Sequence, residues 1–81
     1  MEQMTLANMS VLFKKPEICS YMRAYFNDPT GDYVVINDIL DDLEIGKFVY
    51  DEHFDEQIER IMKTYNTCYL NGYLPESWFD I

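Results

Sequence analysis

A chain of 81 residues is short for more than one domain, so residues 1–81 are expected to fold as a single unit around a small core. Hydrophobic residues make up 48% of the chain and aromatic residues 16%, which excludes a disordered acidic tail, and no apolar run reaches the roughly 20 residues that a membrane helix needs. The net charge of −9 is concentrated in residues 28–59, where eleven acids and one base, Lys47, sum to −10.

Two short helices are expected in the first third of the chain. Thr5 is a suitable N-cap for the first helix. Apolar residues then follow at helical spacing: Leu6, Met9, Leu12 and Phe13. Pro16 disfavours helix at Lys15 and suits the first turn of a second helix. The apolar residues of this second helix follow helical spacing throughout: Ile18, Tyr21, Met22, Tyr25 and Phe26.

The segment after the turn formers of residues 27–32 can be read as helix or strand. Its β-branched stretch at 33–36 is compatible with a short strand. Apolar residues nevertheless continue along one helical stripe: Tyr33, Ile36, Ile39, Leu40 and Leu43. We therefore expect a helix from Asp32 or Asn37 to Glu44, ended by Gly46, which adopts a left-handed conformation at the least cost. Residues 47–50 are a second candidate for an extended segment.

The longest helix is expected from Glu52 to about Leu70, with Asp51 as its N-cap and Asn71 and Gly72 at its end. A helical wheel places one apolar stripe on it: Phe54, Ile58, Ile61, Met62, Tyr65, Cys68 and Tyr69. The acids of its first turns lie nearly opposite this stripe. The aromatic tail is expected to fold back over the bundle through Tyr73, Leu74, Trp78, Phe79 and Ile81.

Together these elements predict an all-α protein, a small single-domain bundle of four to five short helices. The remaining alternative is a short extended segment near residues 33–36 or 47–50. The first residues lack the basic and apolar regions of a signal peptide, so we expect a cytoplasmic protein, in the host cytoplasm if the gene is viral.

No residue pattern indicates catalysis. His53 is the only histidine, and no serine lies in a nucleophile motif. The sequence DEHFDE around His53 lacks the second histidine of a di-iron bundle, and residues 37–48 lack the sixth-position glycine of a calcium loop. Cys19 and Cys68 lie far apart and are expected to be reduced, buried thiols. We therefore expect no enzyme, no metal and no cofactor.

The acids of residues 28–59 are the strongest candidates for function. Like charges three or four residues apart on a helix destabilise it, so folding alone does not account for a run that only Lys47 interrupts. Carboxylates at this spacing resemble the spacing of phosphates. The predicted partner-binding residues are Asp38, Asp41, Asp42, Glu44, Asp51, Glu52, Asp55, Glu56 and Glu59. Direct binding to nucleic acid is not expected, because a phosphate backbone would repel this surface.

In size and charge the chain resembles virus-encoded inhibitors of host nucleic-acid enzymes, among them anti-restriction and anti-CRISPR proteins. This resemblance implies a non-catalytic DNA mimic that occupies the nucleic-acid-binding surface of a basic partner protein. One alternative is an assembly or regulatory subunit that binds through aromatic residues, Tyr69, Tyr73, Trp78 and Phe79, with the acids as a solvated face. Monomer and homodimer both remain open.

Overall fold

The computed structural model of the chain describes residues 3–13, 16–26 and 32–74. Within these ranges it contains helices and no strand, so the predicted all-α bundle is confirmed. The elements are α1 (Met9–Leu12), α2 (Pro16–Tyr25), α3 (Asp32–Glu44), the 3-10 helix η1 (Glu52–Phe54) and α4 (Asp55–Leu70). The stretch at 33–36 is helical, whereas residues 47–50 form an irregular linker between α3 and η1.

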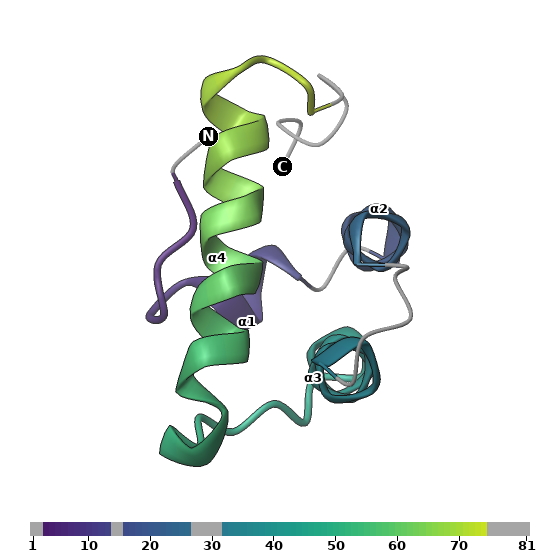
Figure 1. The fold of residues 1–81 in the computed structure, drawn as a ribbon, viewed down its shortest axis with the longest axis vertical. Coiled ribbons are helices and arrows are strands. Elements are labelled where there is room, and N and C mark those ends of the chain that lie inside the picture. Colours follow the sequence, from purple (N-terminus) through teal and green to yellow (C-terminus); the bar gives the residue numbers. More distant parts are fainter. Residues whose placement is uncertain (1–2, 14–15, 27–31, 75–81) are drawn as a thin grey trace.

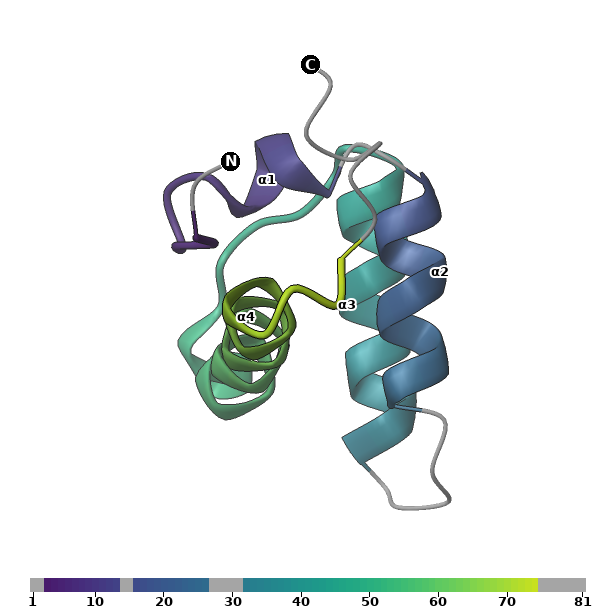
Figure 2. The same cartoon turned by 90° about the horizontal axis from the view of Figure 1, so that it is seen from above.

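Three helices build the body of the molecule. α2 and α3 lie side by side and antiparallel, and α4 runs across the pair (Figures 1 and 2). The buried side chains of these helices meet at their common centre: Ile18, Cys19, Met22, Ile36, Leu40, Leu43, Ile58, Ile61, Tyr65 and Cys68. Phe13 adds its ring, which lies 6.2 Å from the ring of Tyr65 between their centroids. The prediction that both cysteines are buried is therefore confirmed.

The N-terminal segment is attached to α4 by a pair of hydrogen bonds. The Met4 N–H donates to Asn66 Oδ1 at 2.6 Å, and Asn66 Nδ2 donates back to the Met4 carbonyl at 2.9 Å. Thr5 and Asn8 also bond reciprocally, since each side-chain oxygen accepts from the other residue's N–H. This bonding closes a turn over residues 6–8, so α1 begins at Met9. The prediction of Thr5 as N-cap, with the helix starting at Leu6, is therefore wrong.

Glycines end α3 and α4 in the same way. Gly46 and Gly72 have φ of 75° and 70°, which lie in the left-handed region that residues with a Cβ rarely adopt. The Lys47 N–H then bonds to the Asp42 carbonyl at 2.8 Å, and the Tyr73 N–H bonds to the Cys68 carbonyl at 2.9 Å. Both ends are Schellman motifs, and both were correctly located from the glycines.

Two aromatic residues predicted on the apolar stripes are more exposed than expected. Phe54 is 40% exposed because it lies in η1, where residues step by about 120° and leave the stripe of α4. Tyr25 is 50% exposed at the end of α2. Of the tail, Leu74 is buried and Tyr73 is exposed, whereas the predicted contacts of Trp78, Phe79 and Ile81 lie outside the described residues. No helix within the described ranges is long and apolar enough to cross a bilayer.

Candidate functional site

All nine carboxylates predicted to bind a partner lie at the surface, eight of them exposed and Glu44 partly buried. They do not form one continuous face. Two of them turn toward α2, three surround a groove beside α3, and the others follow η1 and the start of α4. The three groups have different neighbours and therefore different chemistry.

The first group is neutralised by a base on α2. One guanidinium nitrogen of Arg23 lies 2.6 Å from Asp41 Oδ1 and 2.8 Å from Glu44 Oε2. Burial lowers the pKa of Arg23, but the hydrogen bonds to Glu44 and Asp41 outweigh it and leave the pKa raised. These two acids therefore join α2 to α3, a role in folding that the sequence prediction did not assign to them.

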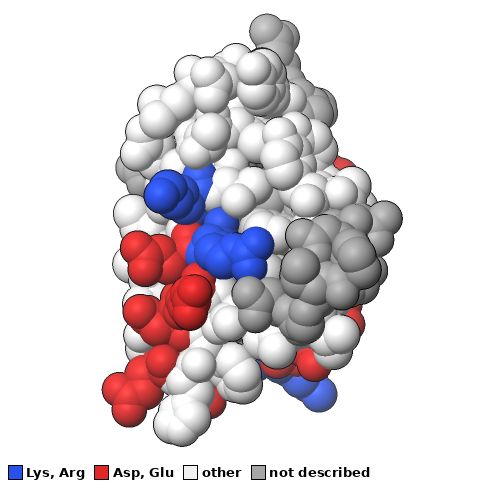
Figure 3. All heavy atoms as spheres, viewed as in Figure 1, with Lys and Arg blue, Asp and Glu red and all other residues white. Residues whose placement is uncertain are grey.

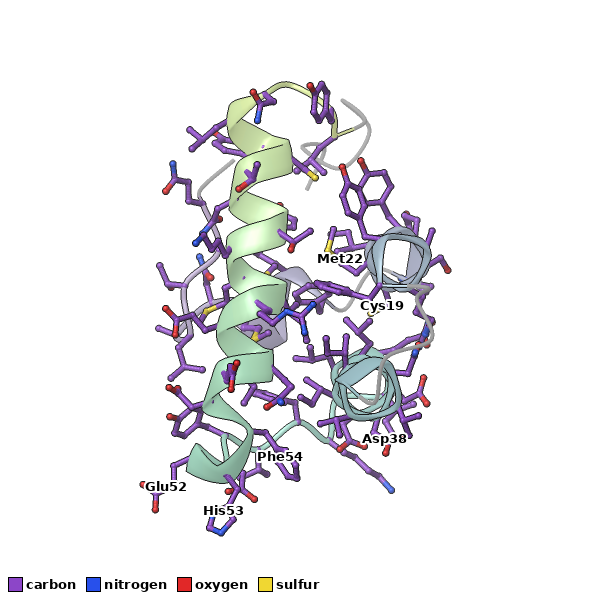
Figure 4. The ribbon with its side chains drawn as sticks, viewed as in Figure 1. Cys19, Met22, Asp38, Glu52, His53 and Phe54 are labelled. Carbon is purple, nitrogen blue, oxygen red and sulfur yellow. The ribbon has the colours of Figure 1, made fainter. Side chains whose placement is uncertain are left out.

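The second group surrounds a groove of about 260 Å³ between α3 and the segment that leads into α4. Its apolar lining consists of Val35, Ile39, Phe48, Val49, Phe54 and Ile58. Ile39 and Ile58 are buried, whereas Val49 and Phe54 are exposed. Figure 4 shows Phe54 on the side of η1 that is turned toward α3, while Met22 reaches from α2 toward α4 in the core. The groove thus has an apolar floor and an accessible apolar edge.

Carboxylates complete the groove. Asp38 and Asp42, one helical turn apart on α3, line it together with Asp51 from the start of η1. None of its nine described lining residues is a base, and Lys47 lies outside that set. The groove is therefore apolar inside and acidic at its edge.

The linker beside the groove is fixed by two of the predicted acids. Asp51 Oδ1 accepts a hydrogen bond from the His53 N–H at 2.9 Å and so caps η1. The sequence predicted Asp51 as the N-cap of a long helix from Glu52, whereas residues 52–54 form the 3-10 turn and α4 itself begins at Asp55. The Tyr50 hydroxyl donates to Asp55 Oδ1 at 2.7 Å, and this hydrogen bond raises the pKa of Tyr50. Next to these hydrogen bonds, Val49 is 82% exposed and Tyr50 is 43% exposed.

The third group follows η1 and the first turns of α4. Glu52 and His53 point away from the body of the protein (Figure 4). Figure 3 shows acidic side chains gathered along the lower part of α4, with Lys and Arg side chains next to them over its middle. α4 itself supplies Arg60 and Lys63, and the Arg60 guanidinium lies 5.6 Å from the ring centroid of Phe26. These acids are thus bordered by bases on α4, whereas none of the described residues that line the groove is a base.

The described residues hold few groups suited to catalysis. Burial, followed by repulsion from Glu44, raises the pKa of Cys19 to about 11, so its thiol stays protonated at neutral pH. Its Sγ lies 3.5 Å from the Phe13 carbonyl and 3.7 Å from the Leu40 carbonyl, deep between α1, α2 and α3. In the described part of the chain, no three His, Cys, Asp or Glu side chains are grouped to hold a metal ion.

Comparison with known protein families, curated proteins and solved structures finds no match to the chain. A function must therefore be inferred from these surfaces alone. Sequence reasoning missed the accessible apolar residues of the groove, because Phe54 was assigned to the core and Val49 and Tyr50 only to a linker. The available signal was the presence of apolar side chains in a segment predicted to lie outside any helix, between Gly46 and Asp51.

Proposed function

We propose that this chain is a non-catalytic protein-binding module whose exposed carboxylates engage a basic surface of a partner protein. The observation that carries this proposal is the contrast in charge pairing on α3. Asp41 and Glu44 are paired with Arg23, whereas Asp38 and Asp42 form no ion pair with any described base. Unpaired like charges one turn apart destabilise a helix slightly, which a binding role would explain.

The partner that best fits this surface is a protein that handles nucleic acid. A segment with a charge of −10 attracts a positively charged groove over long range and speeds their encounter. The chain would then occupy the partner's nucleic-acid site and compete with phosphates, as an inhibitor of the virus-encoded, anti-defence type. Duplex DNA and RNA are themselves disfavoured as ligands because they carry the same sign of charge.

A second candidate is a subunit that binds chiefly through aromatic contacts. Tyr73 is 63% exposed and supports this alternative, whereas Tyr69 is partly buried against the core. The other two aromatic residues named for it, Trp78 and Phe79, lie outside the described residues. Salt separates the two candidates, because a carboxylate-driven complex weakens steeply with ionic strength and an aromatic one hardly changes.

The test is affinity capture from extracts of the native host cells, with two charge-neutralised variants run beside the wild type. One variant carries Asp38→Asn and Asp42→Asn, and the other carries Glu52→Gln, Glu56→Gln and Glu59→Gln. At least one should bind the captured partner about a hundredfold more weakly, since several charge-assisted contacts of roughly 1 to 3 kcal/mol are lost. Excess nucleic acid should also displace the wild-type chain from its partner.

The proposal is wrong if both variants keep full affinity and nucleic acid does not displace the chain. Survival of the complex in about 1 M salt would favour the aromatic alternative. Circular dichroism of both variants should match the wild type, because the substituted side chains are exposed.

A further inference from the structure

We propose that the groove between α3 and residues 48–54 binds a short basic segment of the partner, with one apolar side chain inserted between flanking Arg or Lys residues. This inference rests on the proposed function and specifies the partner's chemistry at one of its surfaces. Three observations carry it: the apolar floor of the groove, the carboxylates on both of its edges, and its volume.

The floor of the groove favours an apolar side chain. Ile39 and Ile58 close it from below at 8% and 1% exposure, and Phe48 packs partly buried beside them. Val49 and Phe54 stay accessible at its edge, at 82% and 40% exposure. An apolar anchor from a partner would cover both, and aromatic side chains such as Phe54 are frequent anchor points in interfaces.

The edges of the groove favour cations on either side of that anchor. Asp38 and Asp42 line the α3 wall, and Asp51 lies on the opposite wall. Asp51 already accepts a hydrogen bond from the His53 N–H, whereas Asp38 and Asp42 have no ion pair with a described base. A neutral segment would leave Asp38 and Asp42 without an ionic partner, whereas Arg or Lys would form charge-assisted hydrogen bonds with them. An Arg side chain could in addition stack on the Phe54 ring.

The size and charge of the groove argue against other occupants. About 260 Å³ accommodates one or two side chains and lies below the usual range for a cofactor or drug-sized ligand. A nucleic acid or an anionic membrane would be repelled by the three carboxylates. A second copy of the chain would bring a charge of −9 to the same place. A basic peptide segment of another protein remains the best fit.

The experiment uses the full-length chain and two labelled eight-residue peptides. One peptide carries a single Leu between two Arg pairs, and the other has Gly in place of that Leu, so the two have equal charge. Fluorescence anisotropy at low salt should show at least about fivefold tighter binding of the Leu peptide, the gain expected from burying one aliphatic side chain. Amide chemical shifts should change at residues 35–42 and 48–54.

Matched variants locate the site. Asp38→Asn with Asp42→Asn should weaken binding of the Leu peptide at least about tenfold, whereas Glu56→Gln with Glu59→Gln, which removes the same charge outside the groove, should weaken it less than about threefold. Val49→Ser should reduce the preference for the Leu peptide over the Gly peptide. Val11→Ser, at a comparably exposed valine of α1, should leave that preference unchanged.

Equal affinity for the two peptides, or shift changes centred on residues 56–59, would overturn the groove as the binding site and leave a charge-driven function standing. Absence of binding at about 1 mM peptide would also overturn it, because even a weak specific site should be occupied at that concentration. The capture experiment tests the proposed function independently. Loss of the partner only in the Glu52, Glu56 and Glu59 variant would support the function and contradict the groove.

Discussion

Both sides of α3 carry carboxylates, but the two sides face different neighbouring elements. On the side that faces α2, Asp41 and Glu44 share the guanidinium of Arg23. On the side that faces the linker and η1, Asp38 and Asp42 border an apolar groove with no base among its described lining residues. A carboxylate's role in this protein is therefore decided by the neighbouring element and not by its own helix.

From this difference we infer a role in stability for the paired side, and we propose a role in binding for the open side. The paired side joins α2 to α3 over the buried thiol of Cys19, so its loss should weaken the fold. The open side contributes no ion pair within the described residues and should be dispensable for folding. The following predictions test the two sides separately and, in one case, the buried interior beside the paired side.

Charge reversal on the open side should have the largest effect. Asp38→Lys with Asp42→Lys should lower affinity for the captured partner by at least about a hundredfold, because attraction becomes repulsion at the contact itself. Isothermal titration calorimetry measures this loss. Glu56→Lys with Glu59→Lys changes the net charge equally and should lower affinity less than about tenfold. Equal losses in the two variants would mean that net charge alone matters.

Alkaline pH should lower the free energy of unfolding because two buried groups in the interior next to the paired side resist ionisation. The pKa of Cys19 is raised by burial to about 11 and that of Tyr65, also by burial, to about 12. Both groups stay protonated in the folded chain after they have ionised in the unfolded chain, so stability is full below about pH 9 and falls as pH rises. Between its pKa in the unfolded chain and its pKa in the folded chain, each group should lower the free energy of unfolding by about 1.4 kcal/mol per pH unit.

Urea unfolding at pH 8, 9, 10 and 11 measures this slope. Cys19→Ala removes one titrating group and should flatten the loss between about pH 9 and 11, even though it lowers stability at neutral pH. An unchanged slope in this variant would show that the thiol is not the group responsible.

Removal of the base on the paired side should have a moderate effect on stability. Arg23→Gln should lower the free energy of unfolding by about 1 kcal/mol, which corresponds to about 4 to 8 °C in Tm, because Glu44 is left partly buried without its partner. Lys63→Gln removes the same charge from α4, where no described ion pair involves Lys63, and should change Tm by less than about 2 °C. Similar losses in both variants would contradict a specific role for Arg23.

The smallest expected effect is a slight gain in stability. Asp38→Asn with Asp42→Asn removes like-charge repulsion one turn apart and should raise the free energy of unfolding by about 0.2 to 0.5 kcal/mol. Differential scanning calorimetry should therefore show a slightly higher Tm. A clear loss of stability would mean that these two acids have a structural role after all.

Local patterns in the sequence were sufficient to predict much of the fold. Apolar spacing located α2, α3 and α4, and Gly46 and Gly72 marked two helix ends, because these signals depend on residues within a few positions of one another. The start of α1 was predicted wrongly, since the reciprocal bonds between Thr5 and Asn8 close a turn ahead of the helix.

The candidate site could be predicted only in part. The sequence pointed to the acids as a group, and whether they bind a partner stays a prediction. It could not separate Asp41 from Asp42, because the distinction depends on Arg23, 18 residues away from Asp41 in the chain. The groove likewise arises from α3, the linker and α4, which meet only in the folded chain.

The most direct test of the account compares two variants of α3 that lose the same charge. One carries Asp38→Asn and Asp42→Asn, and the other carries Asp41→Asn and Glu44→Gln. Tm and partner affinity are measured on the same samples. The first variant should lose at least about tenfold in affinity with its Tm kept, and the second should lose about 4 to 8 °C in Tm with affinity within about threefold. The account would be contradicted if both variants lowered affinity equally, or if the first variant lost Tm and the second lost affinity.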